Sequence, residues 1–142
     1  MEYLRLYRGT PVNKTDIDLF KKLYNKKVFS KCFLSASTNQ EIGRIFSMKN
    51  LKGTQVPVLF KIDVELTYLN EIGRDISRIS NYPNEKEWLL PYGSHLQILE
   101  VTEETFRHQN ENIELAGFCI RMKKLPQNNA RELNLKFIKV LK

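Results

Sequence analysis

The sequence predicts one domain of the α+β class, in which a largely antiparallel sheet carries a few helices. Segments patterned like strands outnumber the two or three segments with helical periodicity, which favours this class. The length of 142 residues suffices for a single domain with a real core. The composition, 42% hydrophobic and 27% charged, is ordinary for a soluble globular protein.

The first third of the chain predicts two strands and two helices. Residues 3–9 alternate like a strand, and Gly9-Thr10-Pro11 predicts a turn that leaves Arg8 at the end of that strand. A helix is expected from Asn13 or Thr15 to about Asn25. A second strand is expected over residues 28–35. Thr38 then has capping-box spacing to Glu41 and predicts a helix that continues to about Met48.

The rest of the chain predicts mainly strands. Residues 55–64 are almost continuously apolar and suggest a central strand, whereas residues 66–80 suggest a loop or a short helix. Further strands are expected over residues 85–90, 95–101, 113–122 and 133–141.

The net charge of +7 indicates a polyanionic partner, such as nucleic acid, a phosphorylated cofactor or an acidic protein surface. A generic basic surface is the simpler interpretation, and charge alone does not displace it. No apolar run reaches the roughly 18 residues that span a bilayer, and the N-terminus does not resemble a signal peptide. We therefore expect the chain as given to be soluble, with no membrane partner; its compartment and oligomeric state stay open.

The cysteines and histidines do not predict a metal site. Cys32 and Cys119 lie in apolar or strand-like sequence, and two buried free thiols are the simpler interpretation, although one disulfide is an alternative. His95 and His108 have no partner at the spacing of metal ligands. We expect no metal cofactor.

Two carboxylates, Glu85 and Glu87, provide the first indication of chemistry. On an extended strand they would project side by side, because residues i and i+2 share a face. Paired carboxylates suit a reaction that passes through a sugar oxocarbenium ion, since one can stabilise the positive charge while the other handles a proton or positions an acceptor. The alternative is an edge strand with a solvated charged face.

Two further segments carry polar side chains near the ends of predicted strands. Arg8 could offer its fork of donors to a phosphate or pyrophosphate, and Gly9 would let a ligand approach the backbone. Ser35 and Ser37 end a strand just before a helix and could donate to a neighbouring group. Phe46, in that helix, has the spacing of a core residue.

Taken together, these segments resemble the arginine-serine-glutamate class of mono-ADP-ribosyltransferases, which includes vertebrate arginine-specific ectoenzymes and clostridial binary toxins. The similar blocks are residues 6–9, 33–37 and 76–93, in the family's order and spacing. The block around Glu-x-Glu is the most specific. The resemblance implies the fold of this family, two packed, mainly antiparallel sheets with a few flanking helices. It also implies transfer of ADP-ribose from NAD to arginine side chains of a target protein.

The resemblance also implies a role for each matching residue. Arg8 would hold the NAD phosphates, and the backbone of Gly9 would bond to the nicotinamide amide. Ser35 would contact the nicotinamide ribose and orient the catalytic glutamate, with Ser37 beside it, and Phe46 would pack on the nicotinamide. Glu87 would bind the ribose 2′-hydroxyl and stabilise the oxocarbenium ion. The acceptor arginine would be engaged by Glu85, and Tyr82 would help to select the target.

The chain departs from the family at two points. Ala36 stands where Thr is common, between serines that remain in place. The predicted domain, residues 1–142, starts at the first core strand, so the N-terminal helical region of many relatives is expected to be absent. The chain would then be a minimal catalytic core or a domain of a larger protein.

Two other functions remain open. A NAD glycohydrolase would transfer ADP-ribose to water, although water does not need Glu85 as well as Glu87. A degenerate fold could be a non-catalytic module that binds nucleic acid or protein through its basic surface. Nucleic acid is possible but not favoured, because aromatic residues are not interleaved with Lys and Arg on a strand as base stacking requires.

Overall fold

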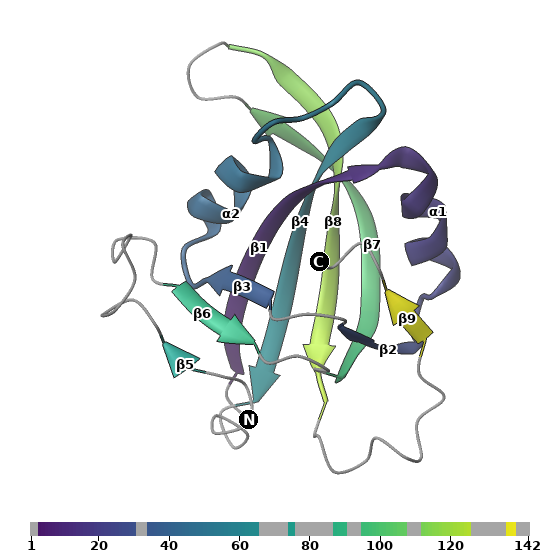
Figure 1. Cartoon of the computed structure of the whole chain (residues 1–142), viewed down its shortest axis with the longest axis vertical. Helices are drawn as coiled ribbons and strands as arrows, with labels where there is room; N and C mark the ends of the chain where they lie inside the picture. Colours follow the sequence, from purple (N-terminus) through teal and green to yellow (C-terminus); the bar gives the residue numbers. More distant parts are fainter. Residues whose placement is uncertain are drawn as a thin grey trace.

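The computed structural model describes residues 3–30, 34–65, 74–75, 87–90, 95–107, 112–125 and 136–138. These residues form one curled sheet of nine strands with two helices (Figure 1). The strand order is β5-β6-β3-β1-β4-β8-β7-β2-β9. The β4–β8 and β2–β9 pairs are parallel and the other pairs are antiparallel, so the predicted class, α+β around a mainly antiparallel sheet, is confirmed.

The elements have the following bounds. The strands are β1 (Tyr3–Asn13), β2 (Lys27–Ser30), β3 (Leu34–Ser37), β4 (Gln55–Glu65), β5 (Arg74–Asp75), β6 (Glu87–Leu90), β7 (His95–Arg107), β8 (Glu114–Lys124) and β9 (Lys136–Ile138), and the helices are α1 (Lys14–Lys22) and α2 (Gln40–Ser47). The segments predicted over residues 66–80 and 133–141 are described only at β5 and β9. Cys32 and His108 lie outside the described residues.

Four long strands, β1, β4, β8 and β7, form the middle of the sheet, and alternation divides their side chains between two faces. The inner face carries the main hydrophobic core, which includes Leu6, Val58, Phe60, Ile62, Val64, Ile98, Ile120 and Met122. The outer face carries the alternate residues, among them Tyr7, Lys61 and Arg121. A β-bulge between Ile98 and Glu100 shifts the register of β7 against β8.

The two layers expected from the sequence are parts of this single sheet, which bends back on itself. Strands β2 and β3 are separated by only three residues, yet five strand positions separate them in the sheet order. On a flat sheet those five positions would span about 24 Å. The four links from Ser30 to Leu34 reach at most about 14 Å. The sheet must therefore curl until its two ends approach each other.

This arrangement corrects the prediction of one strand over residues 28–35. The apolar run is divided between β2, which pairs with β7 and β9, and β3, which pairs with β1 and β6. A run of apolar residues does not reveal such a division, because both pieces are patterned like strands.

The turn predicted at Gly9-Thr10-Pro11 is also wrong, since β1 continues to Asn13 and Arg8 lies within the strand. Pro11 is paired opposite Pro57 of β4. In an antiparallel ladder alternate residue pairs exchange no hydrogen bonds, so two prolines can face each other without interrupting the ladder.

The two helices pack on opposite faces of the sheet. Phe20 of α1 meets Phe60 on the inner face, edge to face, with ring centroids 5.6 Å apart. Helix α2 lies on the outer face, where Gly43 adjoins Tyr7 and Leu59.

The N-cap of α2 is Asn39, whose side chain accepts a hydrogen bond from the Glu41 amide at 3.0 Å; the sequence predicted Thr38 for this role. Neither helix, among the residues described, is long and apolar enough to cross a membrane.

Candidate active site

A cleft of about 330 Å³ opens where β1 and β3 separate. These strands are paired at a single position, Tyr7 opposite Ser37, and helix α2, which follows β3, lies beside the gap. The described residues that line the cleft are Tyr7, Arg8, Gly9, Thr10, Ser35, Ala36, Ser37, Ile42, Gly43, Phe46, Lys49 and Asn50. Five residues predicted to bind the cofactor, Arg8, Gly9, Ser35, Ser37 and Phe46, are therefore brought together here.

Gly9 places the backbone of α2 directly against β1. A Cβ atom at residue 9 would collide with the carbonyl oxygen of Gly43 and would lie 2.6 Å from the Ser47 amide nitrogen. The first reason for glycine at this position is thus helix packing, rather than the turn that the sequence suggested. The close contact fixes one wall of the cleft.

Arg8 connects the two strands that diverge around the cleft. Its Nη1 atom donates a hydrogen bond of 2.9 Å to the carbonyl oxygen of Ser35. Lys49, just beyond the end of α2, contributes a second positive charge to the lining. None of the described lining residues is a carboxylate, so the local charge favours an anionic ligand.

Ser35 and Ser37 lie on the face of β3 opposite the core, since the residues that alternate with them, Leu34 and Ala36, are core residues. The hydroxyl of Ser37 accepts a hydrogen bond of 3.0 Å from the Asn39 amide, which ties the strand end to the start of α2. Ser37 is 4% exposed and Ser35 is half-buried.

Phe46 is half-buried and lines the cleft instead of joining the buried core. The ammonium of Lys49 lies 5.3 Å from the centroid of its ring. An aromatic face at the wall of a cleft can stack on a planar ring, and the cation above it adds an electrostatic contact.

Glu87 is the first residue of β6, and its Cα atom is paired with that of Ser37. Ser37 is in turn paired with Tyr7, so the backbones of Tyr7, Ser37 and Glu87 follow one another across three neighbouring strands. Glu85 and Tyr82 lie outside the described residues.

The sequence did not single out Lys49 and Asn50, which also line the cleft. Lys49 follows Phe46 by three residues, which places it one turn further along the chain, near the end of the helix. Asn50 adopts a positive φ of 57°, which asparagine tolerates better than most residues. A lysine and an asparagine after an amphipathic helix resemble an ordinary helix end, so only the fold reveals their position.

The curled mixed sheet and the cationic cleft between β1, β3 and α2 agree with the class of protein that the sequence indicated, the ADP-ribosyltransferases. A family model described as "ADP-ribosyltransferase exoenzyme" matches residues 1–120, and the chain belongs to this family. The resemblance found in the sequence is thereby confirmed at the level of the ADP-ribosyltransferases. No curated protein sequence matches the chain.

Solved structures share the fold at low sequence identity. The Vis toxin of Vibrio splendidus has a TM-score of 0.66 and 22% identity, over 99% of this chain and 57% of Vis. HopU1 of Pseudomonas syringae has a TM-score of 0.62 and 18% identity, over 87% of this chain and 45% of HopU1. The C2-I component of Clostridium botulinum C2 toxin has a TM-score of 0.63 and 19% identity, over 89% of this chain and 32% of C2-I.

The chain spans about half of the length of Vis and HopU1 and a third of C2-I. Vis has also been solved in complex with agmatine. Among the described residues of the present chain, no three His, Cys, Asp or Glu side chains are grouped so that they could hold a metal ion.

Proposed function

We propose that this protein is a mono-ADP-ribosyltransferase that moves ADP-ribose from NAD to an arginine side chain of an acceptor protein and releases nicotinamide. Family membership supports the donor, because ADP-ribosyltransferases use NAD. The observation that carries the proposal is the register of β3 and β6, which pairs Glu87 with Ser37 beside a cleft that contains Arg8.

The cleft fits the nicotinamide half of NAD. Its volume of about 330 Å³ is at the lower end of small-molecule sites, roughly 300–1,000 Å³. Arg8 and Lys49 supply charge for the pyrophosphate, and Phe46 supplies a ring face for nicotinamide. Ser35 and Ser37 supply hydroxyls for the ribose.

Glu87 acts on the bond between the ribose and nicotinamide. As nicotinamide leaves, positive charge develops on the ribose, and a fixed carboxylate stabilises that charge more than it stabilises the ground state. Glu85 orients the guanidinium of the acceptor, which is a poor nucleophile while it is protonated. Tyr82 contributes to the choice of acceptor. Agmatine, which Vis binds in its crystal structure, is a guanidine and therefore a simple test acceptor.

The proposal is tested with labelled NAD and agmatine, comparing wild type with Glu87→Gln, Glu85→Gln and Glu114→Gln. Glu114 is an exposed carboxylate on β8, 58% accessible, and serves as the matched control. Glu87→Gln should lower nicotinamide release and agmatine labelling by about 100- to 1,000-fold, the usual cost of removing one transition-state contact. Glu85→Gln should keep nicotinamide release and lose labelling.

Each other outcome has a definite meaning. An active Glu87→Gln enzyme would refute the catalytic assignment. Nicotinamide release by wild type without labelling of agmatine would indicate a NAD glycohydrolase or a different acceptor. No release at all would favour a binding module on the same fold.

A further inference from the structure

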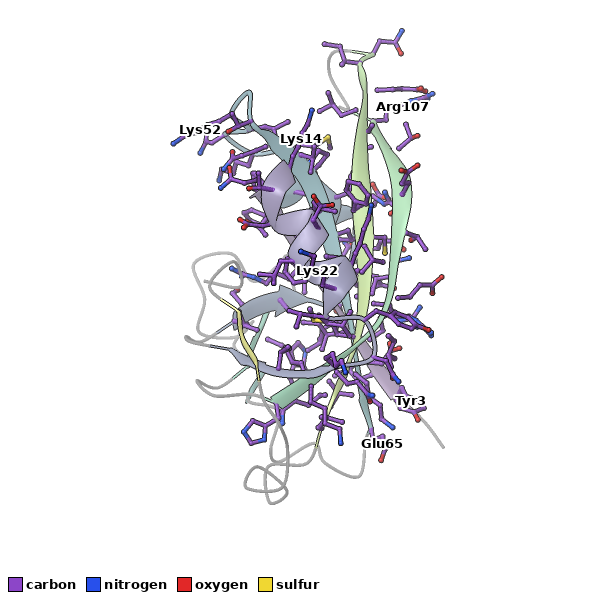
Figure 2. All side chains as sticks on the ribbon, turned by 90° about the vertical axis from the view of Figure 1, so that its right-hand side faces the viewer. Tyr3, Lys14, Lys22, Lys52, Glu65 and Arg107 are labelled. Carbon is purple, nitrogen blue, oxygen red and sulfur yellow. The ribbon has the colours of Figure 1, made fainter. Side chains whose placement is uncertain are left out.

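Helix α2 covers the outer face of the sheet over β1, β3 and β4, and among the described residues no helix covers the part of this face beside it. In Figure 2 the long strands are seen nearly edge on, with Tyr3 and Glu65 together at one end and Lys22 on helix α1. The part of the outer face beside α2 contains a second cleft of about 260 Å³, called here the outer cleft. It is lined by Arg5, Lys61, Glu100, Thr102, Cys119 and Arg121, which come from β1, β4, β7 and β8.

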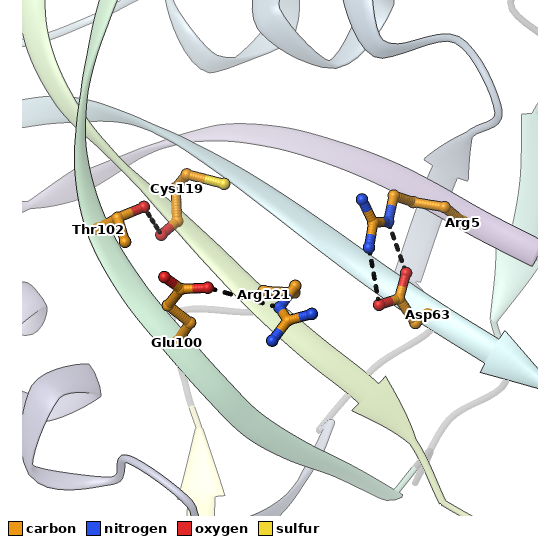
Figure 3. Close-up of polar contacts among 6 residues, drawn as sticks. All are labelled: Arg5, Asp63, Glu100, Thr102, Cys119 and Arg121. Carbon is orange, nitrogen blue, oxygen red and sulfur yellow. Dashed lines mark hydrogen bonds and ion pairs between the residues drawn. The ribbon is translucent and has the colours of Figure 1, made fainter. Parts of the chain in front are cut away.

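Among the described residues, three ion pairs lie in and beside the outer cleft, away from helix α2, and each uses one carboxylate. Figure 3 shows two of them: Arg5 contacts Asp63 at 2.6 and 3.0 Å, and Arg121 lies 3.6 Å from Glu100. In the third, Lys123 lies 3.5 Å from Glu65. Asp63 raises the pKa of Arg5, and Tyr7 on the same face adds a smaller effect in that direction. These three bases are thus matched by three acids.

Lys61 is the basic residue of the outer cleft that has no acidic partner among the described residues. No described residue forms an ion pair or a side-chain hydrogen bond with it, and the register places it directly opposite Arg121. Like charges at directly opposed positions destabilise a sheet. The repulsion between Lys61 and Arg121 would be relieved if an anion from outside the chain bound between them.

A buried donor in the same cleft supports this interpretation. The Nε atom of Arg121 is buried and has no hydrogen-bond partner among the residues described, because Glu100 at 3.6 Å is beyond hydrogen-bonding distance. Buried polar groups are nearly always satisfied, so an unsatisfied donor beside a cleft indicates a missing partner.

Cys119 does not supply the missing charge. Burial raises the pKa of its thiol, so the side chain stays protonated and neutral at physiological pH. The Thr102 hydroxyl donates to the Cys119 carbonyl oxygen at 3.4 Å and carries no charge either (Figure 3).

The remaining composition of this face resembles a protein interface. Tyr3, Arg5 and Tyr7 alternate along β1, and tyrosine and arginine are enriched where proteins meet. The volume of the outer cleft is small for a free organic ligand but sufficient for one carboxylate side chain. Tyr7 also lines the candidate active site and is paired with Lys61, so the two clefts are neighbours.

We propose that the outer cleft docks a carboxylate-rich segment of the acceptor protein, with Lys61 binding a carboxylate between Arg5 and Arg121. This inference rests on the proposed transferase function, since the acceptor is the partner. Docking here would hold a target beside the cleft in which its arginine is modified.

The binding test does not depend on catalysis. A fluorescein-labelled peptide with one arginine flanked by glutamates is compared with the same peptide carrying glutamines, by fluorescence anisotropy at low salt. Wild type should bind the glutamate peptide more tightly. Lys61→Gln should weaken that binding about fivefold, as expected for one partly exposed charge contact, and Lys61→Arg should restore it. Lys22→Gln, an exposed lysine on α1, is the matched control and should bind like wild type.

The transfer test separates docking from chemistry. With the glutamate peptide as acceptor, Lys61→Gln should raise KM about fivefold, whereas its kinetics with agmatine should equal those of wild type. Failure of wild type to release nicotinamide would overturn the proposed function. The anisotropy measurement would still show whether the outer cleft binds the glutamate peptide.

Three results would overturn the inference itself. The first is equal affinity of wild type for the two peptides, and the second is a Lys61→Gln variant that binds the glutamate peptide as tightly as wild type does. The third is displacement of the glutamate peptide by inorganic phosphate added at the same concentration of negative charge. The last result would identify a site for small anions in place of a docking surface.

Discussion

At the scale of single residues, Gly9 shows how a motif glycine can be required for packing. Its φ angle is not in the left-handed region, so the chain does not need glycine there for conformational freedom. It needs the absence of a side chain, because the backbone of α2 occupies the space that a Cβ atom would take.

Gly9→Ala is therefore expected to lower the free energy of unfolding by about 1–3 kcal/mol, the usual range for overpacking a tight contact. It should also weaken NAD binding, because α2 must move away from β1. Gly53→Ala is the control, since its new methyl group would meet nothing within 4 Å. Urea titration of both variants checks the expectation, and equal midpoints would contradict it.

The residue scale also shows the limits of motif reading. Arg8, Ser35 and Ser37 belong to recognisable blocks, and the fold brings them to one cleft. Lys49 and Asn50 belong to no such block, and their place depends on where α2 ends against β1. The register that pairs Glu87 with Ser37 is likewise set by the fold.

At the scale of elements, an ion pair holds α2 to the outer face of the sheet. Arg44 Nη2 lies 2.5 Å from Glu104 Oε1 of β7, with 22% and 27% of the side chains exposed, and the guanidinium lies 5.4 Å from the Phe106 ring centroid. The same helix carries Gly43 and Phe46, which line the cleft. The ion pair therefore acts on the cleft through the position of the helix.

Arg44→Met should lower the free energy of unfolding by about 1–2 kcal/mol, because it leaves the carboxylate of Glu104 largely buried without its partner. It should also raise KM for NAD. Adding Glu104→Gln removes the stranded charge and should restore most of the stability.

The control for this prediction is Arg107→Met. Arg107 pairs with Glu114, but the two side chains are 70% and 58% exposed, so the loss should stay below about 0.5 kcal/mol. Thermal melts and NAD titrations compare the variants. Equal losses in Arg44→Met and Arg107→Met would show that α2 is not held by this pair.

Elements were predicted well where a local pattern was sufficient. The central strand β4, helix α1 and strand β8 lie close to their expected positions. The division of residues 28–35 between β2 and β3 was missed, because it depends on partners far away in the sequence. The continuation of β1 past Gly9 was missed for the same reason, since pairing with β4 overrides the local turn signal of glycine and proline.

At the scale of the whole molecule, the buried thiol of Cys119 links stability to alkaline pH. Burial raises its pKa above the ordinary value of 9.0. Above that pH the unfolded chain loses the proton while the folded protein keeps it, so stability falls as the pH rises towards the folded pKa. Below pH 9.0 the effect vanishes because the thiol is protonated in both states.

Cys119→Ala should therefore show a smaller decline of unfolding free energy between pH 9 and 10.5 than wild type, with parallel profiles between pH 7 and 8. Urea titrations across this range measure the difference in slope, and other titrating groups cancel because both proteins contain them. Parallel profiles at alkaline pH would contradict the expected link.

The curl of the sheet also governs how the chain must fold. Val58 of β4 pairs with Phe118 of β8, and Tyr3 of β1 pairs with Glu65, so the middle of the sheet is built from partners that are distant in the sequence. The entropy of closing these long loops must be overcome before the pairs form, which makes such topologies slow to fold. During synthesis β1 can pair with β3 at only one position until β4 has left the ribosome, and β4 then lacks its second neighbour until β8 follows. The newly made protein therefore exposes unpaired strand edges for most of its synthesis. During that period it is prone to aggregate with other copies of the same chain through these edges.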